Sequence, residues 1–112
     1  MDSLSPLAAQ AARTFKSRAE DAGGERILEF RVFGSMARGE AHAGSDLDIF
    51  VMVDQRDPKL DRAIIEAACS VEEELGFPFL VSPRIMARAH FEELVRRERL
   101  LARDILNDGI PL

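Results

Sequence analysis

Two aspartates, Asp46 and Asp48, open an apolar run that ends near Val53 and are separated by one residue. If this run is a strand, both side chains point the same way, because side chains alternate between the two faces. Two neighbouring carboxylates repel each other unless a cation lies between them. Mg²⁺ prefers oxygen ligands and leaves coordination positions for the phosphates of a substrate. The pair therefore predicts a magnesium site.

A glycine-serine pair, Gly34-Ser35, follows an earlier apolar run from Phe30 to Phe33. Gly34 allows the backbone to approach a ligand closely. Ser35 is predicted to open a short helix over residues 35–38, and free N–H groups at a helix N-terminus favour an anion. A phosphate cradle and a metal site would then lie on adjacent strands. This combination suits transfer of a nucleotidyl group, in which catalysis is mostly positioning and charge neutralisation.

The order Gly34-Ser35, ten further residues, then Asp46-Leu47-Asp48 resembles the Gly-Ser-x10-Asp-x-Asp motif of the DNA polymerase β-like nucleotidyltransferase superfamily. The longer strings, residues 34–39 and 45–48, are most similar to the minimal nucleotidyltransferases. These are small proteins that are often encoded beside a HEPN-domain partner. The strong similarity covers residues 34–51, and a looser similarity covers the rest of the chain.

The resemblance implies a role for each matching residue. Gly34 and Ser35 would hold the β- and γ-phosphates of ATP, and Asp46 and Asp48 would bind Mg²⁺, as one ion or as a two-metal pair. Arg38 is a candidate contact to a phosphate or a partner, and equally a solvated charge on an exposed helix. The implied reaction moves AMP from ATP to a hydroxyl. The acceptor would belong to a HEPN toxin, which makes this chain the antitoxin of a toxin–antitoxin pair.

The chain departs from the family pattern at the third strand. Many members carry a third carboxylate there, and the matching position here is Phe79. No acid lies between Leu75 and Phe91, and the substitutes Glu29 and Asp54 lie away from the motif. A second hypothesis is therefore a binding module with weak or absent catalysis that acts through a partner protein. A transferase for a small molecule such as an aminoglycoside is less favoured, because so short a chain leaves little room for a substrate domain.

Composition predicts one globular domain over residues 1–112, with 46% hydrophobic and 31% charged residues. A net charge of −5 argues against strong non-specific binding to nucleic acids. The single cysteine, Cys69, is predicted to pack rather than react, and fits a reducing cytoplasm. No membrane span or signal segment is expected. The small size indicates association with a HEPN-type partner or with a second copy.

The predicted fold class is α/β (α+β), with a small mixed sheet of three or more strands and helices packed on one face. The tail Ile110–Leu112 is expected to pack down or meet a partner. Arginines from Arg84 to Arg103 make the last predicted helix basic, either as a solvated face or as a docking surface. His42 and His90 lack the spacing of a zinc site. Helices are predicted over residues 4–21, 35–38, 58–75 and 87–106, and strands over 26–33, 47–53 and 77–82.

Overall fold

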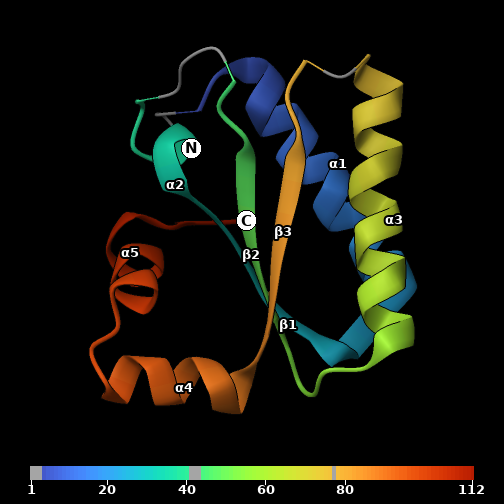
Figure 1. Cartoon of the computed structure of the whole chain (residues 1–112). Helices are drawn as coiled ribbons and strands as arrows, with labels where there is room; N and C mark the ends of the chain where they lie inside the picture. The colour runs from blue at the N-terminus through green and yellow to red at the C-terminus, as the bar shows by residue number, and fades with distance from the viewer. Residues whose placement is uncertain (1–3, 41–43, 77) are drawn as a thin grey trace.

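The computed structural model describes residues 4–40, 44–76 and 78–112, and Figure 1 gives their arrangement. None of the described helices is both long enough and apolar enough to cross a membrane. In chain order the elements are α1 (Pro6–Gly23), a 3₁₀ turn (Gly24–Arg26), β1 (Ile27–Phe33), α2 (Gly34–Ala37), β2 (Leu47–Val53), α3 (Pro58–Leu75), β3 (Val81–Ala87), α4 (Arg88–Arg96), α5 (Leu100–Asp108) and β4 (Ile110–Pro111).

The four strands form one mixed sheet in the order β3-β2-β1-β4. β1 is antiparallel to both β2 and β4, whereas β2 and β3 are parallel. A parallel pair requires a crossover connection, and α3 supplies it. The predicted mixed α/β class is therefore confirmed. The tail also packs down as predicted, because β4 pairs with β1 and the Leu112 N–H donates to the Phe30 carbonyl at 3.1 Å.

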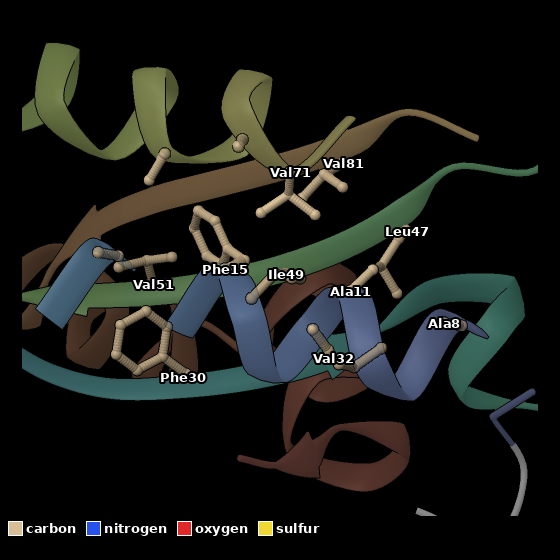
Figure 2. Close-up of a cluster of buried hydrophobic side chains, with 14 of the residues drawn as sticks. Ala8, Ala11, Phe15, Phe30, Val32, Leu47, Ile49, Val51, Val71 and Val81 are labelled. Carbon is tan, nitrogen blue, oxygen red and sulfur yellow. The ribbon is translucent and has the colours of Figure 1, made fainter. Parts of the chain in front are cut away.

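α1 and α3 cover one face of the sheet and build the larger core with it (Figure 1). Apolar residues of β1 and β2 alternate onto this face, among them Val32, Ile49 and Val51, as Figure 2 shows. Phe15 of α1 lies fully buried against them and meets Phe30 edge to face, with ring centroids 6.0 Å apart. Small alanines on α1 let the helix approach the strands closely.

The opposite face is also covered, which corrects the expectation of helices on one face only. Phe33, Phe50 and Met86 form a second cluster there with residues of α4 and α5. The Phe50 ring contacts the Phe91 ring at a centroid distance of 4.8 Å. β2 is thus buried from both sides. After Asp48 this strand carries only apolar residues, which is typical of a central strand that is covered on both faces.

The single helix predicted over residues 87–106 is two helices, α4 and α5. The chain turns at Glu98, which has a φ of +53°. The Arg99 N–H reaches back to the Leu94 carbonyl and the Glu98 N–H to the Val95 carbonyl, both at 3.0 Å. These two bonds are the pattern that ends a helix with a left-handed residue, here without the usual glycine. The helical periodicity continues across this turn, so the sequence pattern did not reveal it.

The third strand was predicted over residues 77–82, and this placement is wrong. β3 runs from Val81 to Ala87, so that Pro83 lies inside it and not at its end. β3 is an edge strand, and an edge strand tolerates a proline because one side of its backbone has no strand to pair with. Phe77 lies outside the described residues.

Other helix ends follow the sequence signals. The Ser5 hydroxyl accepts from the Ala8 N–H at 3.1 Å, and the Asp57 carboxylate accepts from the Lys59 N–H at 3.0 Å. Gly76 ends α3 with a φ of +74°. These three positions confirm the predicted caps.

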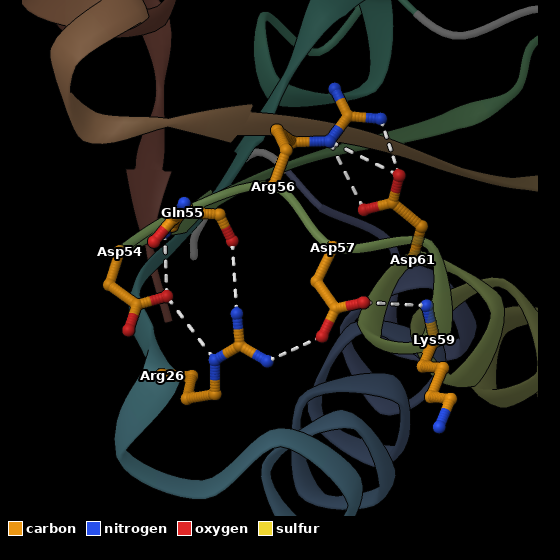
Figure 3. A network of polar contacts seen from close by, with 7 residues as sticks. All are labelled: Arg26, Asp54, Gln55, Arg56, Asp57, Lys59 and Asp61. Carbon is orange, nitrogen blue, oxygen red and sulfur yellow. Dashed lines mark hydrogen bonds and ion pairs between the residues drawn. The ribbon is translucent and has the colours of Figure 1, made fainter.

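A polar network holds the junction of β2 and α3, at the end of β2 away from Asp46 (Figure 3). The Arg26 guanidinium donates to Asp57 at 2.9 Å, to the Gln55 carbonyl at 3.2 Å and to Asp54 at 3.4 Å. The hydrogen bond from Arg26 lowers the pKa of Asp57. This network fixes the start of α3 and involves only the end of β2 that is distant from Asp46 and Asp48.

Replacement of Phe91 by alanine tests whether α4 is held by the second cluster. We expect Phe91→Ala to lower the free energy of unfolding by about 3–5 kcal/mol, because a buried ring is lost against Phe50. Leu100→Ala is the control, since Leu100 is 70% exposed and should change stability by less than about 0.5 kcal/mol. Urea denaturation measures both, and equal effects of the two changes would contradict this packing.

Candidate functional site

Gly34 lies directly against Asp48. β1 ends at Phe33, and the sheet register pairs Phe33 with Asp48. Gly34 has a φ of +78°, and a Cβ placed on it would lie 2.5 Å from the Asp48 Oδ2 atom. The backbone conformation therefore favours glycine at this position, and any Cβ would force the Asp48 carboxylate to shift. The glycine-serine turn and the second aspartate are neighbours, as the sequence predicted.

A hydrogen bond between serines links the turn to the loop that precedes β2. The Ser35 hydroxyl donates to the Ser45 Oγ at 3.3 Å, and Ser45 is 92% buried, with 8% of its surface exposed. Ser45 immediately precedes Asp46, so this contact fixes the approach to the carboxylate pair. Asp46 also lines a shallow hollow of about 220 Å³, together with Gly44, Ser45 and residues 78–80.

The two carboxylates interact electrostatically. Asp48 is half-buried and Asp46 is exposed. Burial raises the pKa of Asp48, and the charge of Asp46 raises it further, whereas Arg84 lowers it. The structure thus brings Gly34, Ser35, Asp46 and Asp48 together at one end of the sheet. Such a cluster of acids disfavours negative charge unless a cation joins it.

Arg38 lies at the end of α2, and its recorded partners are acids. It donates to Glu40 at 3.1 Å and lies 3.9 Å from Asp108 of α5. The hydrogen bond to Glu40 raises the pKa of Arg38. Its side chain is 36% exposed. In this conformation the guanidinium ties α2 to α5, and a role in binding phosphate stays a prediction.

The third strand presents two polar residues that the sequence analysis did not assign to the site. β3 pairs Ser82 with Asp48 and Arg84 with Phe50, in parallel register. Phe79, the residue matched to the third carboxylate, precedes β3 and packs against the larger core. Arg84 was expected on the basic helix but belongs to the strand. One sequence signal was available. If the predicted strand is extended past Pro83, Ser82 and Arg84 lie two residues apart and therefore on one face of it.

Neither proposed substitute for the third acid joins the site. Glu29 lies opposite Met52 and forms an ion pair with Arg31 at 3.3 Å. Asp54 follows the far end of β2 and pairs with Arg26. Both carboxylates are held by arginines at a distance from Asp48 along the strands.

The donor set fits a divalent cation that arrives with phosphates. Among the residues that the structure describes, no group of three or more histidine, cysteine or acidic side chains is placed to hold a metal ion. Asp46 and Asp48 supply hard oxygen donors, and the mutual repulsion that helps to raise the Asp48 pKa would be relieved by a cation. Mg²⁺ commonly uses one or two carboxylates and completes its shell with water and substrate phosphates. The site is thus suited to Mg²⁺ in company with a nucleotide. His42 lies outside the described residues.

Comparison with known proteins agrees with this geometry. The model of the nucleotidyltransferase domain family matches residues 12–110. A solved structure assigned to the minimal nucleotidyltransferases is 33% identical, with a TM-score of 0.55, and the alignment covers 95% of each chain. No curated protein matches the chain significantly.

Two structures of toxin–antitoxin proteins share the fold at lower identity. One, solved with AMP-PNP, is 19% identical with a TM-score of 0.53, and the alignment covers 87% of this chain and 68% of the other. The second is a mutant of the toxin–antitoxin MntA–HpeT, 17% identical with a TM-score of 0.52, over 86% and 68% of the two chains. At these identities the similarity establishes the fold.

Removal of the Asp48 charge should stabilise the unliganded chain. A raised pKa means that ionised Asp48 disfavours the fold at neutral pH, and this penalty disappears as pH falls below about 4, where the group is protonated in both states. We expect Asp48→Asn to raise the midpoint of thermal unfolding at pH 7 by a few degrees, on the order of 1–4 °C, and the gain to shrink on acidification. Calorimetry across this pH range measures it.

Asp21→Asn is the matched control, because Asp21 is an exposed acid of α1. It removes the same charge away from the site and should leave the midpoint nearly unchanged. A lower midpoint for Asp48→Asn at pH 7 would mean that the carboxylate is structural.

Proposed function

The chain belongs to the nucleotidyltransferase domain family, and we propose that it transfers AMP from ATP to a hydroxyl group with Mg²⁺ as cofactor. The observation that carries this proposal is the contact between Gly34 and the Asp48 carboxylate. This contact brings the glycine-serine turn next to Asp48, and Asp46 acts on Asp48 through its charge.

Each residue then has a defined task. The backbone of Gly34 and Ser35 receives the β- and γ-phosphates, and the absence of a side chain on Gly34 lets the Asp48 carboxylate lie directly beside this turn. Asp46 and Asp48 hold Mg²⁺, which when bound neutralises charge on the triphosphate. The Ser35–Ser45 hydrogen bond keeps the turn and the acids at a fixed separation. Rigid placement matters because phosphoryl chemistry depends largely on positioning.

The proposed step is an in-line displacement. The acceptor hydroxyl oxygen forms a bond to the α-phosphorus of ATP, and the bond from that phosphorus to the oxygen bridging the α- and β-phosphates breaks. Pyrophosphate leaves, and the hydroxyl proton passes to a carboxylate of the pair. We assign to Asp48, which is less exposed than Asp46, the orientation of the attacking oxygen.

We further propose that the acceptor hydroxyl belongs to a partner protein, a HEPN-type toxin, for which this chain is the cytoplasmic antitoxin. The toxin–antitoxin proteins with the same fold support this reading. The small domain also favours an acceptor supplied by another chain, since the hollow beside Asp46 is only about 220 Å³.

Substitution of the two aspartates tests the transfer. The chain is incubated with α-³²P-labelled ATP, Mg²⁺ and the protein encoded by the adjacent gene. We expect label on the partner, and a loss of at least about 100-fold in Asp46→Asn and in Asp48→Asn because charge neutralisation is removed. Asp21→Asn should retain the wild-type rate. A partner that stays unlabelled in the presence of tightly bound Mg-ATP would contradict the transferase assignment.

The second candidate function is a binding module without catalysis. The third strand favours it, because the residue of β3 opposite Asp48 is Ser82 and not a carboxylate. A surface on α4 and α5 also favours it: a hollow of about 340 Å³ is lined by Val95, Ala102 and Leu106 together with the charged residues Glu98 and Arg103, and Leu106 is 45% exposed. We name this the α4–α5 surface. In this case the chain inhibits its partner by contact alone.

A charged substitution separates docking from nucleotide binding. Leu106→Asp should weaken the complex with the partner by roughly tenfold or more, because an apolar contact is replaced by a charge. Ile65→Asp on α3 is the control, since Ile65 is an apolar residue of similar exposure, 49%, on the other face of the sheet. Surface plasmon resonance gives the two affinities, and equal losses would exclude a specific role for the α4–α5 surface.

A further inference from the structure

Arg84 shares a face of the sheet with Asp48. β3 is parallel to β2, with Ser82 opposite Asp48 and Arg84 opposite Phe50. Directly paired residues project to the same side, so Ser82, Arg84 and Asp48 all lie on the face that carries Phe50. Diagonal neighbours on two strands are roughly 7–8 Å apart, a distance that a long side chain spans. Arg84 is therefore one row from the carboxylate pair.

The charge of Arg84 acts on the site and is not neutralised locally. It lowers the pKa of Asp48, against the effects of burial and of Asp46. Within the described part of the chain the structure records no ion pair for Arg84, which is exposed. Arg84 lines a hollow along β3 together with Arg56 and His90, and Arg56 is bound there by Asp61 at 2.6 Å. The guanidinium of Arg84 is thus an available cation whose charge reaches Asp48.

An available guanidinium at this position has a chemical consequence. Arginine binds phosphate oxygens in a bidentate manner and keeps its charge at any relevant pH. A fixed positive charge one row away also opposes a second divalent cation beside Asp48, where the paired residue is Ser82 and not a third carboxylate. One metal ion and one arginine would then share the negative charge of the triphosphate.

We propose that Arg84 binds a phosphate of the nucleoside triphosphate held at Asp46 and Asp48, and that the site takes up one divalent cation instead of two. This inference rests on the proposed function and adds to it a residue from β3. It assigns to Arg84 the share of the phosphate charge that a second metal ion would otherwise neutralise.

Binding of Mn²⁺ and of Mn²⁺ with AMP-PNP to the full chain tests the proposal by titration calorimetry. We expect one Mn²⁺ per chain in the wild type. Arg84→Gln should weaken binding of the Mn²⁺–AMP-PNP complex by roughly tenfold or more, because a charge-assisted hydrogen bond is lost. The same change should leave binding of Mn²⁺ alone equal or tighter, because a positive charge is removed. A residue with only a structural role would not weaken binding of the Mn²⁺–AMP-PNP complex while binding of Mn²⁺ alone stays equal or becomes tighter.

Three further variants sharpen the result. Arg84→Lys should recover part of the nucleotide affinity, and Arg84→Glu should raise the stoichiometry toward two Mn²⁺ per chain. Arg88→Gln, which removes an exposed arginine of the following helix, should match the wild type. Unchanged thermal midpoints show that each variant is folded, as expected for an exposed position.

Three outcomes overturn different claims. Unchanged Mn²⁺–AMP-PNP affinity in Arg84→Gln, with that affinity lost in Asp48→Asn, would refute the role of Arg84 and leave the proposed function intact. A wild-type chain that binds no Mn²⁺–AMP-PNP would refute the proposed function, and the role of Arg84 with it. A wild-type stoichiometry of two Mn²⁺ would refute the single-cation site.

Discussion

The contact between Gly34 and the Asp48 carboxylate is the constraint on which the site depends. It exists because β1 and β2 are antiparallel neighbours, so that the residue after the end of β1 meets the start of β2. A positive φ and a gap too small for a Cβ leave glycine as the fitting residue. Any larger residue would strain the backbone of the turn and force the Asp48 carboxylate to shift.

The surrounding packing keeps this contact rigid. β2 is apolar on both faces below Asp48, with α1 and α3 against one face and α4 and α5 against the other. The polar network around Arg26 holds the far end of the same strand. Burial on both faces therefore fixes β2, and the aspartates lie at the end of this strand that the Arg26 network does not hold. The mutual repulsion of the acids is a cost in stability that the core offsets.

The second layer of helices connects the site to the rest of the surface. Arg38 joins α2 to α5 through Asp108, so the glycine-serine turn is coupled to the same two helices that carry the α4–α5 surface. A partner docked on these helices would sit on elements that contact both the turn and β3. A partner docked in this one position could be either modified or inhibited by contact. Which of the two occurs depends on the residues that β3 places beside Asp48, where Ser82 stands in place of a carboxylate.

The sequence by itself determined the local features. The glycine-serine turn, the Asp-x-Asp pair, the caps at Ser5 and Asp57, the αL end at Gly76 and the limits of β2 each depend on a few neighbouring residues. The tertiary structure decided where β3 begins, because its start is set by pairing with β2 and not by Pro78 or Pro83. It also decided the division of α4 from α5, since Glu98 takes a left-handed conformation that few residues mark in advance. Ser82 lies opposite Asp48, and Arg84 opposite Phe50, for the same reason: the register between two parallel strands is fixed by packing of residues far apart in the chain.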